Sequence, residues 1–61
     1  MKTQELLKLL KRNSCHIIRN GSRHDIWYSE ITKQQFTVPS HKAEIPVGTL
    51  KHILKDAGIN N

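Results

Sequence analysis

Leucines recur at helical spacing near the start of the chain. Leu6, Leu9 and Leu10 occupy positions i, i+3 and i+4, and mostly polar or basic residues lie between and around them. This pattern predicts an amphipathic helix with one face toward a core. Thr3 is the expected N-cap, because a threonine hydroxyl can accept a hydrogen bond from a backbone N–H of the first turn. The polar pair at residues 13–14 is expected to end the helix.

The middle of the chain contains three short runs that are typical of β-strands. Strands are predicted over residues 15–19, 23–28 and 35–38, and the last of them ends at Pro39. A turn at residues 30–34 separates the second strand from the third.

A strong turn signal, Asn20-Gly21-Ser22, separates the first two strands. Asn-Gly between apolar runs favours a hairpin, since both residues tolerate positive φ. A two-residue turn would place His24 on the same face as Ile17, whereas a longer turn through Ser22 would change the cross-strand partners. The sequence therefore predicts a hairpin and leaves its register open.

A second helix is predicted after a loop at residues 40–45. Pro46 is expected in its first turn, where the missing N–H costs nothing, and Gly58 suits the position just after its last residue. Its apolar positions follow helical spacing: Val47, Leu50, Ile53, Leu54 and Ala57.

Together these elements predict a single α+β domain over residues 1–61, in the order α-β-β-β-α. The three-stranded antiparallel sheet would carry both helices on one face and leave the other face open. This is the architecture of double-stranded-RNA-binding domains. Architecture does not fix function, which depends on the residues that the fold brings together.

The chain is strongly basic, with 10 Lys and Arg residues against 5 Asp and Glu and a formal net charge of +5. This excess favours a polyanion as partner, because each phosphate that a protein neutralises releases condensed counterions. It would also suit an acidic protein or an anionic membrane surface. A domain of 61 residues has little room for an enclosed pocket, so any activity is expected on an open surface.

The sequence offers no obvious metal or cofactor site. Its 4 histidines include no pair at the i, i+4 spacing of helical zinc sites, and its acidic residues do not cluster. Cys15 is the single cysteine and is expected to be a small apolar strand residue. The first residues lack the apolar run of a signal peptide, and no stretch is apolar enough to cross a membrane. We therefore expect a cytoplasmic protein that needs no cofactor.

Metal-free cleavage of RNA is a chemistry that these residues could perform. RNA carries its own nucleophile, the 2′-hydroxyl, so cleavage needs a base, an acid and cations near the phosphate. Histidine suits the proton transfers because its ordinary pKa is about 6.5. His24 is the main candidate, with Arg23 beside it; Asp25, the next residue, could assist it electrostatically if the geometry of the strand allows. His41, next to Lys42, could contact phosphate or act as a second acid.

The other histidines and the aromatic residues fit structural roles better. His16 begins a strand and His52 lies off the apolar stripe of the second helix, so both are expected to be structural or surface residues. Trp27, Tyr28 and Phe36 could stack on bases, but a domain with few aromatic residues is expected to place them in its core.

Three motif segments follow one another along nearly the whole chain. The first is the G-S-x-H segment Gly21-Ser22-Arg23-His24, and the second is Phe36-Thr37-Val38-Pro39 followed by His41. The third is Glu44-Ile45-Pro46-Val47-Gly48-Thr49-Leu50 with Ile53-Leu54-Lys55-Asp56-Ala57-Gly58. In this order the three segments closely resemble the HicA toxins.

The resemblance implies the toxin half of a type II toxin–antitoxin system, with a fold like that of double-stranded-RNA-binding domains. It further implies a ribonuclease that acts on messenger RNA and a HicB antitoxin that covers the active surface. His24 corresponds to the family's essential histidine, and Gly21 and Ser22 correspond to its shaping turn. The helix start corresponds to Pro46, Gly48 and Thr49.

The leading interpretation is thus a metal-independent endoribonuclease toxin, with His24 as the catalytic residue. The turn consists of Asn20, Gly21 and Ser22, and the candidate RNA contacts are Arg23, His41, Lys42 and Lys51. A non-catalytic RNA-binding module is the alternative, and an interaction domain whose basic surface binds an acidic protein is a third possibility.

Overall fold

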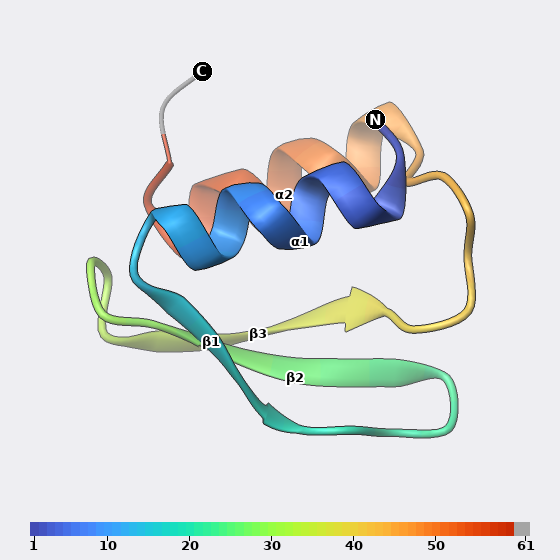
Figure 1. Cartoon of the computed structure of the whole chain (residues 1–61). Helices are drawn as coiled ribbons and strands as arrows, with labels where there is room; N and C mark the ends of the chain where they lie inside the picture. Colours follow the sequence, from blue (N-terminus) through green and yellow to red (C-terminus); the bar gives the residue numbers. More distant parts are fainter. Residues whose placement is uncertain (60–61) are drawn as a thin grey trace.

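The computed structural model describes residues 1–59, so Asn60 and Asn61 of the predicted domain lie outside the described residues. The elements are α1 (Thr3–Arg12), β1 (Cys15–Arg19), β2 (His24–Ser29), β3 (Gln34–Pro39) and α2 (Val47–Ala57). The strands form one antiparallel sheet in the order β1-β2-β3. Both helices lie across the same face of this sheet, and no element of the described chain lies on the other face (Figure 1). The α+β class and the order of elements are confirmed.

The core lies between the helices and the sheet. Leu6 and Leu10 of α1 are fully buried, as their spacing predicts. Trp27 of β2 is 2% exposed and is the largest fully buried side chain. Cys15 is also buried, in agreement with its predicted role. The other buried apolar side chains come from β3, from α2 and from the segments on either side of α2: Phe36, Val38, Ile45, Ile53, Ala57 and Ile59.

The starts of both helices differ from the prediction. Lys2 occupies the N-cap position of α1, and no side chain of the described residues caps this end. Thr3 is the first helical residue, and its hydroxyl and N–H donate hydrogen bonds to the carbonyls of Lys42 and Ala43 respectively. Pro46 precedes α2 in the N-cap position. The start of α1 is therefore fixed by pairing with the loop before α2, a contact that sequence spacing cannot show.

The end of α2 agrees with the prediction. Gly58 has a φ of +78°, in the left-handed region that glycine adopts easily, and its N–H donates to the carbonyl of Lys55 at 3.1 Å. At the other end of α2, Val47 is an exception to the apolar stripe because its side chain is 65% exposed. No helix within residues 1–59 is long and apolar enough to cross a membrane.

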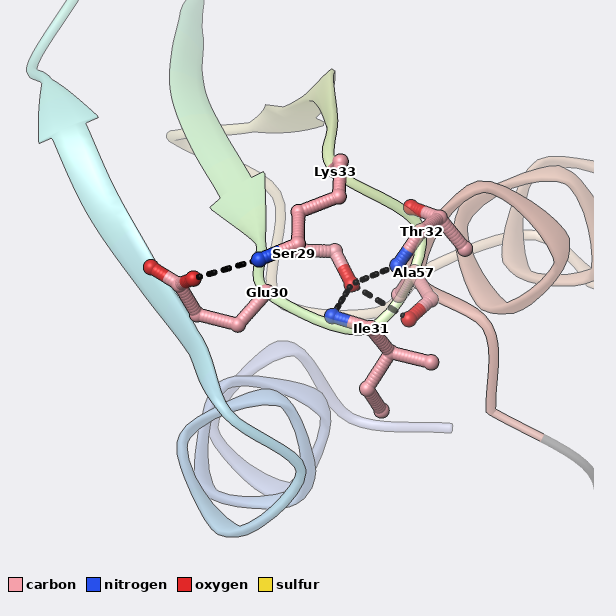
Figure 2. A network of polar contacts seen from close by, with 6 residues as sticks. All are labelled: Ser29, Glu30, Ile31, Thr32, Lys33 and Ala57. Carbon is pink, nitrogen blue, oxygen red and sulfur yellow. Dashed lines mark hydrogen bonds and ion pairs between the residues drawn. The ribbon is translucent and has the colours of Figure 1, made fainter.

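Ser29 ties the turn between β2 and β3 to the end of α2 (Figure 2). Its buried Oγ donates a 2.7 Å hydrogen bond to the carbonyl of Ala57 and accepts the N–H groups of Ile31 and Thr32 at 3.2 and 3.3 Å. The hydroxyl of Thr32 donates to the carbonyl of Asp56 at 2.6 Å. Buried hydroxyls with several partners are costly to remove, at about 1–3 kcal/mol. This network therefore holds one end of the sheet against α2.

The connection between β1 and β2 is longer than a two-residue hairpin. Strand pairing reaches Arg19 opposite Ile26, with a register shift between Ile17 and Arg19. The loop then spans residues 20–23, and Gly21 does not have the positive φ that an Asn-Gly turn uses. Because the shift inserts an extra residue into β1, the two strands cannot close on a tight turn at this end.

Candidate functional site

Four of the predicted site residues come together at one end of the sheet. Arg23, His24, His41 and Lys42 line a shallow hollow of about 350 Å³, which we call the His24 hollow; Ser22 and Pro39 complete its lining. The β1–β2 loop and the loop after β3 both lie at this end of the sheet, opposite the turn that Ser29 anchors (Figure 1). The fold thus brings together two segments that lie far apart in the sequence.

The backbone explains why these two loops meet. His24 is paired with Pro39 at the last position of the β2–β3 ladder. Beyond that pair, the N–H of Ser40 donates a 3.0 Å hydrogen bond to the carbonyl of Arg23. The residues after Pro39 are therefore held beside the start of β2, and His41 follows within two residues of this contact.

His24 projects from the face of the sheet that no helix covers. Side chains alternate between the two faces along a strand. On β2, Trp27 and Ser29 are buried beneath the helices, so His24, Ile26 and Tyr28 belong to the opposite face. We call this the outer face. His24 is exposed there, and its imidazole is accessible to a substrate from solvent.

The predicted electrostatic assistance from Asp25 is wrong. Asp25 is paired with Val38, which is buried in the core, so its side chain belongs to the helix-covered face and not to that of His24. Its Oδ1 accepts a 3.2 Å hydrogen bond from the N–H of Gly21. Asp25 therefore holds the loop that precedes His24 instead of contacting the imidazole.

Gly21 lets this loop fold back onto the start of β2. A Cβ at Gly21 would lie 2.0 Å from the carbonyl oxygen of His24 and 3.2 Å from its carbonyl carbon. An oxygen and a carbon cannot approach so closely without bonding, so a side chain fits only if the backbone moves. Glycine is needed at position 21 because a side chain would collide with the backbone of His24. It is not needed for a positive φ, which the sequence suggested and Gly21 does not adopt.

Lys51, which was predicted to contact RNA, does not line the His24 hollow. It is exposed on α2 and lines a different hollow together with Lys55. The reason is that α2 crosses the covered face of the sheet (Figure 1). The His24 hollow is instead lined by residues of the β1–β2 loop, the first residue of β2 and the segment from the end of β3 onward. His16 and His52 are both exposed, which confirms their prediction as surface residues.

The aromatic residues divide between the core and the surface. Trp27 and Phe36 are buried, as predicted. Tyr28 is half-buried on the outer face, and its ring centroid lies 5.6 Å from that of His16, with 45° between the ring planes. The prediction of a core role is therefore wrong for Tyr28, because the alternation along β2 turns it away from the helices.

The His24 hollow combines two imidazoles, from His24 and His41, with the cationic side chains of Arg23 and Lys42. All four residues are exposed. A base, an acid and positive charge beside a phosphate are what cleavage of RNA by its own 2′-hydroxyl requires. Within residues 1–59, no group of three or more His, Cys, Asp or Glu side chains is placed to hold a metal ion.

A family model described as HicA toxin of bacterial toxin-antitoxin matches residues 3–59 of the 61-residue chain. The chain belongs to the HicA toxin family. The match spans all five elements and every residue of the His24 hollow, and it confirms the family that the three sequence segments indicate. As a HicA family member the chain is a toxin, and a toxin–antitoxin system implies an antitoxin partner. No curated protein and no solved structure matches the chain.

Proposed function

We propose that this HicA family toxin is an endoribonuclease that cleaves messenger RNA in the cytoplasm, with His24 as its catalytic residue and without a metal ion. The His24 hollow carries the proposal, because its lining includes a second histidine, His41, and the cationic residues Arg23 and Lys42 besides His24. The net charge of +5 also supports a polyanionic substrate. Family membership supports the same activity, since HicA toxins interfere with messenger RNA.

The proposed reaction is an internal transesterification. One imidazole of the pair His24 and His41 removes the proton of a 2′-hydroxyl, and the resulting oxygen attacks the neighbouring phosphorus. The other imidazole protonates the 5′-oxygen as its bond to phosphorus breaks. The products are a 2′,3′-cyclic phosphate and a 5′-hydroxyl. Arg23 and Lys42 would stabilise the negative charge that builds up on the phosphate oxygens in the transition state.

We expect the purified toxin to digest messenger RNA in a buffer that contains EDTA. The fragments should carry 5′-hydroxyl ends, which polynucleotide kinase labels without prior phosphatase treatment. The same sequence with 2′-O-methyl riboses should remain intact, because it lacks the nucleophile. RNA binding with a steep salt dependence but no cleavage products in any buffer would instead support the non-catalytic binding module.

We further propose that a HicB-like antitoxin neutralises the toxin by placing acidic or bulky side chains over the His24 hollow. In the complex, modification of His24 and His41 by diethyl pyrocarbonate should decrease strongly, as measured by mass spectrometry of peptides. His52, exposed on α2, provides an internal control that should still react. Equal modification of His24 in the free toxin and in the complex would mean that the antitoxin acts elsewhere.

A further inference from the structure

The outer face of the sheet extends from His24 to residues that have no part in the proposed reaction. His24, Ile26 and Tyr28 of β2 lie on it. The cross-strand pairs place His16 beside Tyr28, and Arg19 beside Ile26. No element of the described chain covers this face (Figure 1). His24 belongs both to this face and to the lining of the His24 hollow, so the two adjoin. A substrate that reaches His24 therefore has an open path along β2.

Tyr28 and His16 form a pair of adjacent rings on this path. Their centroids are 5.6 Å apart and their planes are inclined by 45°. His16 is exposed and Tyr28 is half-buried, whereas the other two aromatic side chains of the chain, Trp27 and Phe36, lie in the core. Both side chains are thus at least partly open to solvent, and unpaired nucleobases of any sequence can stack on such rings.

The charges on the outer face favour a nucleic acid. Asp25 is the single carboxylate within the residues that form the three strands, and it lies on the opposite face, where it is bonded to Gly21. Arg19 is exposed on the outer face, and Arg23 follows in the loop at its end. The path from Tyr28 to the His24 hollow thus has cations and no opposing carboxylate on the strands.

The spacing along β2 fits a strand of RNA. Tyr28 lies four residues from His24 on the same face, which corresponds to about 13 Å along a strand. This is about the length of two nucleotides in an extended single strand. We propose that the substrate is single-stranded RNA laid along β2, an inference that rests on the proposed function. The scissile phosphate lies in the His24 hollow, and a base about two nucleotides away stacks on Tyr28 and His16. A duplex cannot bind in this way, because its bases are stacked and paired inside the helix.

Binding of a short fluorescent 2′-O-methyl RNA, which cannot be cleaved, tests the proposal. Replacing Tyr28 by leucine removes the aromatic ring but keeps an apolar side chain, and it is expected to raise Kd about tenfold, within the range that base–aromatic stacking gives. Tyr28→Phe keeps the ring and should bind within about twofold of the wild type. The same RNA annealed to its complement should bind the wild type more weakly and show no effect of Tyr28→Leu. Urea unfolding of both variants would show that they are folded.

Abasic substitutions locate the stacked base. Removing single bases along the RNA should weaken binding to the wild type at one position, about two nucleotides from the cleaved bond, and should not weaken binding to Tyr28→Leu there. Equal Kd values for wild type and Tyr28→Leu, or equal binding of single and double strands, would overturn the inference. A loss of antitoxin binding in Tyr28→Leu with unchanged RNA binding would overturn it too, and would assign the outer face to a protein. If the wild type binds as described but cleaves no RNA, the single-stranded binding path along β2 stands and the proposed nuclease function fails.

Discussion

Replacing His24 by alanine is expected to lower the rate of RNA cleavage by about 10²–10⁴-fold, the usual contribution of a positioned proton-transfer group. The change should leave the free energy of unfolding within about 0.5 kcal/mol of the wild-type value, because His24 is exposed at the start of β2 and substitutions at such sites have small effects. The rate is measured as single-turnover cleavage of a defined messenger RNA fragment, and stability by urea unfolding. A large loss of activity in a fully folded protein would identify a chemical role for the imidazole.

His52→Ala is the matched control for this experiment. It removes the same side chain from an exposed position on α2, away from the His24 hollow. We expect its cleavage rate to stay within about twofold of the wild type, as for surface substitutions outside a site. The proposal for His24 fails if both alanine variants cleave RNA at the wild-type rate. If the two variants lose activity equally, a loss of general RNA affinity is indicated and not a loss of proton transfer.

The elements were predictable because local spacing encodes them. The leucines of α1 repeat with the period of a helix and are buried where that period places them, as Leu6 and Leu10 show. Gly58 marks the end of α2 by a backbone conformation that other residues adopt with strain. Residue type and position together singled out His24 and His41 among the 4 histidines, since each imidazole has a basic neighbour, Arg23 or Lys42, and follows a turn or a strand end.

The details around His24 were not predictable, because they depend on pairing between distant segments. The register shift between Ile17 and Arg19 determines the length of the β1–β2 loop, and no residue type in β1 predicts this shift. Asp25 directly follows His24 in β2, so alternation along the strand places the two side chains on opposite faces. Its hydrogen bond to the N–H of Gly21 depends on how the longer loop folds back, which the sequence does not show. The place of Lys51 depends on how α2 crosses the sheet, which its position in the sequence does not reveal.

The role of Ser29 also depends on contacts between segments that are distant in the sequence. Ser29 is a small polar residue at the end of a strand, and its burial and its bond to the carbonyl of Ala57 arise only when α2 packs beside the β2–β3 turn. A serine just before a turn is a local signal, since its hydroxyl can accept the backbone N–H groups that follow. That signal predicts the bonds to Ile31 and Thr32 but not the one to α2.

Gly21→Ala is expected to damage the site without touching any group that takes part in the chemistry. The new methyl group would overlap the carbonyl oxygen of His24, which lies 2.0 Å from the Cβ position, so the backbone of the loop or of His24 has to shift. A displacement of about 1 Å can reduce catalysis by about 10²-fold, because proton transfer depends on alignment. The overlap should also lower the free energy of unfolding by about 1–3 kcal/mol, the usual cost of forcing extra volume into a packed place.

Gly48→Ala makes the same chemical change where the structure has room for it. A Cβ at Gly48 meets nothing within 4 Å, and alanine favours the helical backbone over glycine, so α2 should be equally stable or up to about 1 kcal/mol more stable. Urea unfolding of both variants, together with backbone amide NMR shifts of residues 20–25, separates a local displacement from general unfolding. Because Asp25 bonds to the N–H of Gly21, the shifts should concentrate between these two residues. A Gly21→Ala protein with wild-type activity and unchanged shifts would show that the close approach to His24 does not position the imidazole.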